Sequence, residues 1–154
     1  MAITAKKPVR SNGRKSSFKR KTWAEKMLPC RKYEVKKNDY DFADIPAGSK
    51  MLIATPKIVD DYVRQIPKGY FTDIKQIRKD LAAGYKAEYT CPVTTGIFIR
   101  IIAENAHEEY IKGRPLSKIT PFWRALSAKS PSAKKLSFGI KFLKDQQKKE
   151  GIVT

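Results

Sequence analysis

The sequence predicts a mostly α-helical domain with a small β-hairpin, preceded by a basic N-terminal extension. Apolar residues recur at helical spacing in three successive segments that follow residue 51. Two short apolar runs, separated by a polar and basic turn, come after these segments and fit a hairpin. A chain of 154 residues that is 41% hydrophobic can bury one core of ordinary size.

Residues 1–22 are expected to form a disordered basic arm. They contain eight Lys and Arg side chains, no acidic side chain and no periodic apolar pattern. No apolar stretch follows this start, so a secretory signal peptide is not expected. An N-terminal segment that lacks acidic residues and contains Ser and Arg is also typical of an organelle transit peptide, which is the alternative to a DNA-binding arm.

Residues 23–50 are expected to form an extension that packs on the domain, and residues 51–154 the domain itself. Thr22 and Glu25 have the spacing of a capping box, which predicts a short helix over residues 22–28. The rest of the extension has a mixed pattern that does not define its structure.

Two helices are predicted at the start of the domain. Thr55 supplies a hydroxyl cap and Pro56 suits the first helical position, so a helix begins there. Helical spacing of apolar residues continues until residues 67–69 end it. Thr72 is expected to cap the second helix, which ends near Gly84.

A third helix is predicted over residues 94–106, followed by a loop over residues 107–118. Three short helices in this order form a helix-turn-helix, in which the third is the recognition helix. Arg100 and Glu104 are expected to point away from the core. The expected buried face of this helix is Ile97, Phe98, Ile101 and Ile102.

The hairpin is predicted from strands over residues 120–126 and 136–138. The turn between them is polar and basic, and a last helix runs from Gly139 to Gly151. A two-stranded hairpin after three helices is the plan of a winged helix-turn-helix domain.

The formal net charge of +18 predicts a polyanionic partner. Membrane binding would need a basic amphipathic helix or a long apolar run, and neither is found in the sequence. We therefore expect a monomeric protein that binds double-stranded DNA in the cytoplasm, associated with the nucleoid if the source is bacterial; RNA stays open. The expected DNA-binding residues are Thr94, Thr95 and Arg100 on the recognition helix and Lys129, Lys134 and Lys135 on the wing, with simple helix capping as the alternative role of the two threonines.

Metal and cofactor binding are not expected. Cys30 and Cys91 are the only cysteines and His107 is the only histidine, which excludes the ligand clusters of zinc sites. Free thiols in a reducing compartment are expected, with a single disulfide as the alternative.

Three motifs follow one another in the chain: Ile66-Pro67-Lys68-Gly69 with Thr72, then Thr120-Pro121-Phe122-Trp123-Arg124, then Glu150-Gly151. In this order they resemble the DNA-binding domain of the methylated-DNA–protein-cysteine methyltransferases, over about two-thirds of the chain. The resemblance implies the winged helix and DNA binding.

The resemblance also implies that the family reaction is absent. Phe122 stands at the position of the acceptor cysteine and Trp123 at that of the imidazole, while only Arg124 and Glu150 match the family. The chain is therefore more similar to the alkyltransferase-like proteins, which lack the acceptor cysteine. Those proteins bind alkylated guanine without repairing it and mark it for repair proteins.

The resulting hypothesis is a non-catalytic DNA-binding protein that recognises alkylated guanine. Phe122, Trp123 and Arg124 are expected to form the lesion pocket, because an aromatic ring can stack on an extruded base. Burial of a ring in the core and an ion pair between Arg124 and Glu150 are the structural alternatives. Two other functions stay open: a basic nucleic-acid-binding protein without lesion specificity, and a methyltransferase that uses Cys91.

Overall fold

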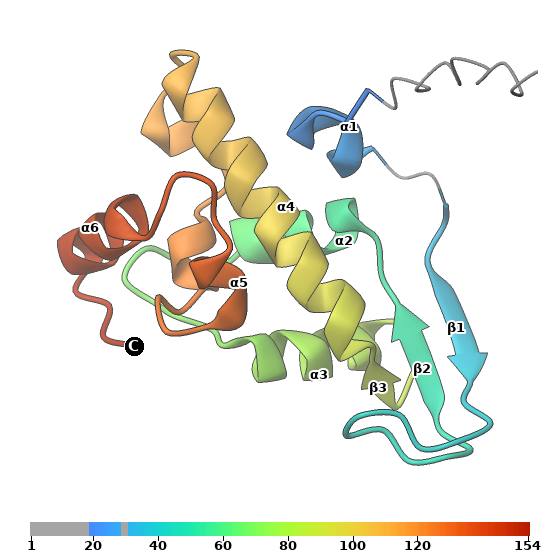
Figure 1. Ribbon diagram of the computed structural model, residues 1–154. Coiled ribbons are helices and arrows are strands. Elements are labelled where there is room, and N and C mark those ends of the chain that lie inside the picture. The colour runs from blue at the N-terminus through green and yellow to red at the C-terminus, as the bar shows by residue number, and fades with distance from the viewer. Residues whose placement is uncertain (1–18, 29–30) are drawn as a thin grey trace, which may run out of the picture.

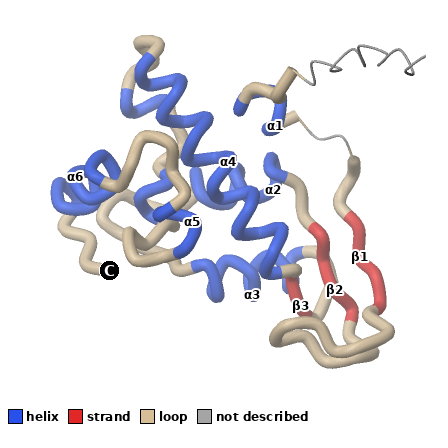
Figure 2. Tube along the Cα trace, in the orientation of Figure 1, coloured by secondary structure: helices blue, strands red, loops and turns tan. Residues whose placement is uncertain are grey.

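The structure of the protein, a computed structural model, describes residues 19–28 and 31–154 (Figure 1). About half of the described residues are helical, and one small sheet lies beside the helices (Figure 2). The predicted combination of helices with a small β element is confirmed. The predicted arm lies outside the described residues except for residues 19–22, which are exposed.

The described helices pack mainly around α4, the longest of them. Within the described part of the chain, no helix combines the length and the apolar character needed to cross a bilayer. The helices are α1 (Trp23–Met27), α2 (Pro56–Arg64), α3 (Ile74–Gly84), α4 (Pro92–Ile111), α5 (Pro131–Lys134) and α6 (Lys141–Glu150), with 3-10 turns η1 (Leu116–Lys118) and η2 (Phe122–Arg124).

Three of the predicted helix boundaries are confirmed. The hydroxyl of Thr22 accepts the backbone N–H of Glu25 at 3.1 Å and so caps α1. Thr55 caps α2 through the N–H of Ile58 at 3.3 Å. Gly151 ends α6 with a φ of 71°, a left-handed conformation that favours glycine.

The predicted cap of α3 is wrong by one residue. Asp73, not Thr72, is the N-cap, and its carboxylate accepts the N–H of Gln76 at 2.8 Å. The backbone N–H of Thr72 instead donates to the carbonyl of Arg124 at 2.8 Å. Thr72 therefore anchors the chain near η2, and the carboxylate that follows it satisfies the helix terminus.

The sheet contains β1 (Glu34–Lys37), β2 (Lys50–Ile53) and β3 (Tyr89–Thr90) in that order. Strands β1 and β2 are antiparallel, and β2 and β3 are parallel, with Leu52 opposite Thr90. Two parallel neighbours need a crossover, which α2 and α3 supply here. The extension therefore adds an edge strand to the domain.

The predicted hairpin over residues 120–126 and 136–138 is wrong, since these residues form η2, turns and the flank of α5. A strand with one solvent face would alternate in burial, but residues 119–123 are all buried. Ser130 caps α5 by accepting the N–H of Ala133 at 3.2 Å, with Pro131 at the first helical position. The expected turn is thus a short helix, and the described chain contains no hairpin at the wing position.

Helix α4 continues five residues beyond its predicted end at residue 106. The imidazole of His107 stacks on the ring of Phe138 at 3.8 Å, with 7° between the planes. Residues 107–111 have a polar sequence that predicts a loop. They remain helical because they pack against the segment before α6.

The buried face of α4 also differs from the prediction. Ile97 is 51% exposed, whereas Glu104 is buried. The Glu104 carboxylate accepts hydrogen bonds from the backbone N–H of Ser137, at 2.6 Å, and from its hydroxyl. These bonds satisfy the buried acid. Ile97 and Glu104 are two turns apart on nearly the same face of α4, so this face is covered at Glu104 and open to solvent at Ile97.

Candidate nucleic-acid interface

Arg124 joins the three motifs of the resemblance in space. Its Nη2 lies 2.7 Å from Oε1 of Glu150, and its Nε lies 3.1 Å from Oε2. Its Nη1 donates to the carbonyl of Ile66 at 2.9 Å. The Arg124 and Glu150 side chains are only 16% and 6% exposed. Arg124 therefore holds η2, α6 and the turn after α2 together.

The electrostatics of this pair favour its charged form. Burial is the largest single influence and would raise the pKa of Glu150, but the hydrogen bonds and charge of Arg124, together with smaller contributions from Trp123 and the Gly69 backbone, outweigh it and the pKa is lowered. The indole N–H of Trp123 contributes in the same direction, although its geometry falls short of a hydrogen bond. The structure therefore contains the Arg124–Glu150 ion pair, which is the alternative to a role of Arg124 in a lesion pocket.

Phe122 and Trp123 lie in the core, with 1% and 3% of their surfaces exposed. The ring of Phe122 stacks on Phe142 at 5.8 Å and meets Phe138 edge-on at 5.9 Å. Trp123 contacts Phe142 edge-on at 6.3 Å. The expected lesion pocket is therefore corrected: in this conformation neither ring has the exposed surface on which a base could stack.

The start of α4 is held by its own hydroxyl groups. Thr95 is fully buried and donates to the carbonyl of Cys91 at 2.7 Å. Half-buried Thr94 donates to the same carbonyl at 3.4 Å. The expected DNA contact of Thr95 is corrected, since a side chain without exposed surface cannot reach a phosphate or a base.

Cys91 lacks the setting of an acceptor thiol. Its free thiol is buried and packs with Ile45 and Met51. His107 is 16 residues further along the same helix, about 24 Å away at 1.5 Å per residue. Burial lowers the pKa of His107, and the charge of Glu104 opposes this effect. The two groups cannot act as a thiol–imidazole pair in this fold.

A groove of about 450 Å³ is lined by residues of α1, α4 and α5, and in Figure 1 α1 and α5 lie on either side of α4. Its floor is apolar, its rim carries three cations, and one wall is an indole ring. The floor residues are Val93, Ile97 and Ile101, the cations are Lys26, Arg100 and Lys135, and the indole is that of Trp23.

All residues that line the groove except Lys26 lie in three sequence segments without acidic residues. Residues 1–24, 89–103 and 110–144 contain no Asp or Glu, and the last of them carries nine Lys and Arg. Glu25 is the acidic residue of α1 and directly precedes Lys26. The separation of basic from acidic residues along the chain is visible in the sequence. The distribution of charge between segments indicates this groove, which the net charge alone does not locate.

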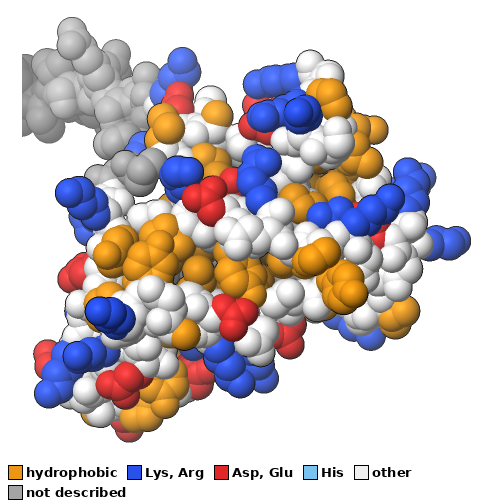
Figure 3. Space-filling model, turned by 180° about the vertical axis from the view of Figure 1, so that it is seen from behind, with side chains coloured by type: hydrophobic (Ala, Val, Ile, Leu, Met, Phe, Trp, Pro, Cys, Tyr) orange, Lys and Arg blue, Asp and Glu red, His pale blue; other side chains and the backbone are white. Residues whose placement is uncertain are grey.

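The opposite side of the molecule carries charges of both signs. In Figure 1 helix α4 crosses in front of α2, and Figure 3 shows the protein from behind. There acidic side chains are interspersed with Lys and Arg around a band of hydrophobic side chains (Figure 3).

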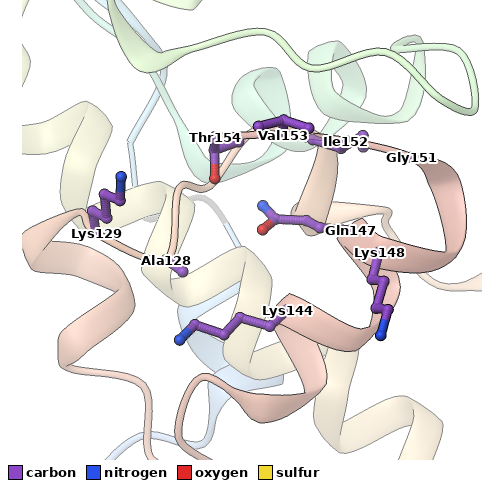
Figure 4. Close-up of a pocket in the computed structure, with 9 residues that line it drawn as sticks. All are labelled: Ala128, Lys129, Lys144, Gln147, Lys148, Gly151, Ile152, Val153 and Thr154. Carbon is purple, nitrogen blue, oxygen red and sulfur yellow. The ribbon is translucent and has the colours of Figure 1, made fainter.

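The three lysines expected on the wing do not lie together. Lys135 lines the groove and Lys134 is exposed on α5. Lys129 lines a second hollow of about 470 Å³, beside Lys144 and Lys148 of α6 (Figure 4). The floor of that hollow includes Gln147, whose amide donates to the carbonyls of Trp123 and Leu126 at 3.1 and 2.8 Å.

The residues that the structure describes contain no group of three or more His, Cys, Asp or Glu side chains that could hold a metal ion. Comparison of the chain with family models, with curated proteins and with solved structures gave no match.

Proposed function

We propose that the protein is a non-enzymatic DNA-binding protein whose contact surface is the face formed by α1, α4 and α5. The observation that carries this proposal is a groove rimmed by Lys26, Arg100 and Lys135, of which Arg100 and Lys135 lie in segments without acidic residues. Phosphate groups supply most of the affinity of nucleic-acid complexes, and cations without acidic neighbours are what they require.

In this proposal α3 and α4 act as the helix-turn-helix and α4 approaches the DNA. Helix α5 docks on α4, where the hydroxyl of Ser132 donates to the carbonyl of Gly96 at 3.3 Å. It thus presents Lys134 and Lys135 where a wing would present its basic tip. Lys19, Arg20 and Lys21 are exposed and add positive charge immediately before α1.

Recognition of alkylated guanine is the second candidate. The meeting of all three family-like motifs at Arg124 supports it, as does the order of these motifs in the chain. A lesion would have to be read at a surface other than Phe122 and Trp123, because both rings are buried. Duplexes with and without a single O6-alkylguanine separate this candidate from general binding, since equal affinities contradict lesion recognition.

The proposal is tested with a labelled 20-base-pair duplex, followed by fluorescence anisotropy over a range of salt concentrations. The double variant Lys26→Glu/Lys135→Glu is compared with Lys36→Glu/Lys79→Glu, which changes the net charge equally at exposed lysines outside the groove. Each lost phosphate contact makes the slope of log K against log salt about 0.9 shallower. We expect the groove variant alone to change the slope by about two contacts. Equal effects of the two variants, or a salt-independent affinity, contradict the proposal.

A further inference from the structure

The indole ring of Trp23 faces cations of the groove. The Nζ of Lys26 lies 4.2 Å from the ring centroid, and the Cζ of Arg100 lies 5.6 Å from it. Both distances fall within the range of cation–π contacts. Trp23 is only half-buried, so part of its ring surface remains accessible from the groove.

Arg100 is held without a carboxylate. Among the residues described, Arg64, Arg78, Arg114 and Arg124 each form a salt bridge, whereas none is formed by Arg100. Its Nε is buried and has no hydrogen-bond partner within the described part of the protein. A cation kept free of acids at the edge of a groove is available to an anionic ligand.

The floor of the groove is unusual for the outer face of a long helix. Val93 and Ile97 are 54% and 51% exposed, one turn apart on α4. Together with the Trp23 ring they form an apolar surface bordered by cations. A nucleotide matches this combination, since it carries a flat apolar base and a phosphate on adjacent parts of one unit. Paired bases in a duplex do not expose that flat face.

We infer that the groove binds an unpaired nucleobase, which lies against Trp23 and the apolar side chains of α4 while Arg100, Lys26 and Lys135 hold the flanking phosphates. The protein then prefers single-stranded stretches over fully paired duplex. This inference rests on the proposed function and adds the kind of nucleic acid that the α1–α4–α5 face selects.

The test uses the full-length protein and two single-stranded probes of equal length and charge. One is a 12-residue oligothymidylate, and the other is the same strand with all bases replaced by abasic sites. Stacking of a base on an aromatic ring predicts about 5- to 150-fold tighter binding of the oligothymidylate. It also predicts that the oligothymidylate quenches the fluorescence of Trp23 in the wild type. In the variant Trp23→Leu only buried Trp123 remains, and its fluorescence is expected to stay unchanged when the oligothymidylate is added.

Trp23→Leu is expected to abolish the preference for bases and to leave the affinity for the abasic strand unchanged, and Trp23→Phe to retain most of the preference. Circular dichroism shows whether both variants are folded. Equal binding of the two probes by the wild type, or an unchanged preference in folded Trp23→Leu, overturns the inference while the proposed function stands. Absence of binding to both strands and to duplex overturns the proposed function itself. Quenching of Trp23 by a polyglutamate peptide without any response to oligothymidylate assigns the groove to an acidic protein partner instead and also overturns the inference.

Discussion

Arg124 and Glu150 form a bidentate ion pair, with Nη2–Oε1 at 2.7 Å and Nε–Oε2 at 3.1 Å, in a largely buried position. The same guanidinium donates to the carbonyl of Ile66. A buried pair of this kind gains little stability over an apolar pair, but loss of one partner leaves the other as an uncompensated charge. The contact therefore makes a sharp prediction about stability.

The variant Glu150→Gln is expected to lower the free energy of unfolding by about 3 kcal/mol, since it leaves the Arg124 charge buried without a counter-ion. Urea unfolding followed by circular dichroism measures this. Asp61→Asn is the matched control, because it breaks an exposed ion pair with Lys57 and is expected to cost less than about 0.5 kcal/mol. Similar losses in both variants would show that the pair is not effectively buried.

The same pair predicts acid sensitivity. The pKa of Glu150 is lowered from 4.5, so its contribution to stability is present above pH 4.5 and is lost as the pH falls through the folded pKa. Glu150→Gln is expected to lack that part of the acid loss. The free energy of unfolding of the wild type and of Glu150→Gln is measured between pH 5 and 3. An equal decrease in both proteins would contradict the prediction.

A second titration is expected from His107. Burial lowers its pKa from 6.5, so the unfolded chain binds the proton first, and stability falls as the pH drops below 6.5. His107→Phe retains a ring that can stack on Phe138 but removes the proton. We expect this variant to lack the loss of stability that the wild type shows between pH 7 and 5.5. A wild type whose unfolding free energy is constant over this interval contradicts the assignment.

Phe122 is predicted to be a core residue. Phe122→Ala is expected to cost about 3–5 kcal/mol of unfolding free energy, the usual range for removal of a buried aromatic ring. Tyr40→Ala, at a ring that is 72% exposed, is expected to stay within about 0.5 kcal/mol of the wild type. Chemical denaturation of both variants measures the difference. A mild effect of Phe122→Ala would indicate an open cavity beside this ring and would restore the lesion pocket.

Asp73 is predicted to be the cap of α3. Asp73→Ala removes the acceptor of the Gln76 N–H and is expected to cost about 1 kcal/mol. Thr72→Ala is the control, since Thr72 uses its backbone N–H in the bond to Arg124 and keeps it in the variant. The two melting temperatures compare them, and a larger loss in Thr72→Ala would return the capping role to the threonine.

The helices at Thr55 and near Gly151 could be predicted because their signals are local. The cap, the proline and the glycine lie within one turn of the boundary that they define. Ser130-Pro131 gives the same signal as Thr55-Pro56, yet the polar and basic residues around it predict a hairpin turn. With only four residues, α5 is too short to show a helical period of apolar side chains.

The sheet and the groove depend on contacts between distant parts of the chain. Strand β3 has only two residues and exists because it pairs with β2, 38 residues earlier at Leu52 and Thr90. Likewise Ile97 and Glu104 lie on nearly the same face of α4, and only Glu104 is covered, by the segment that contains Ser137, which no helical periodicity reports. Trp23 reaches the groove through the packing of α1 on α4. Only the segregation of charge could have indicated this face from the sequence.

Helix α6 completes the interior of the domain rather than extending it. It supplies the carboxylate for Arg124, the ring of Phe142 against Phe122, and the Gln147 amide that satisfies the carbonyls of Trp123 and Leu126. A fragment that stops before this helix would expose all of these groups at once. We therefore expect the last turns and the central helix to melt in a single cooperative transition, so that proteolytic trimming at this end abolishes folding instead of releasing a smaller stable core.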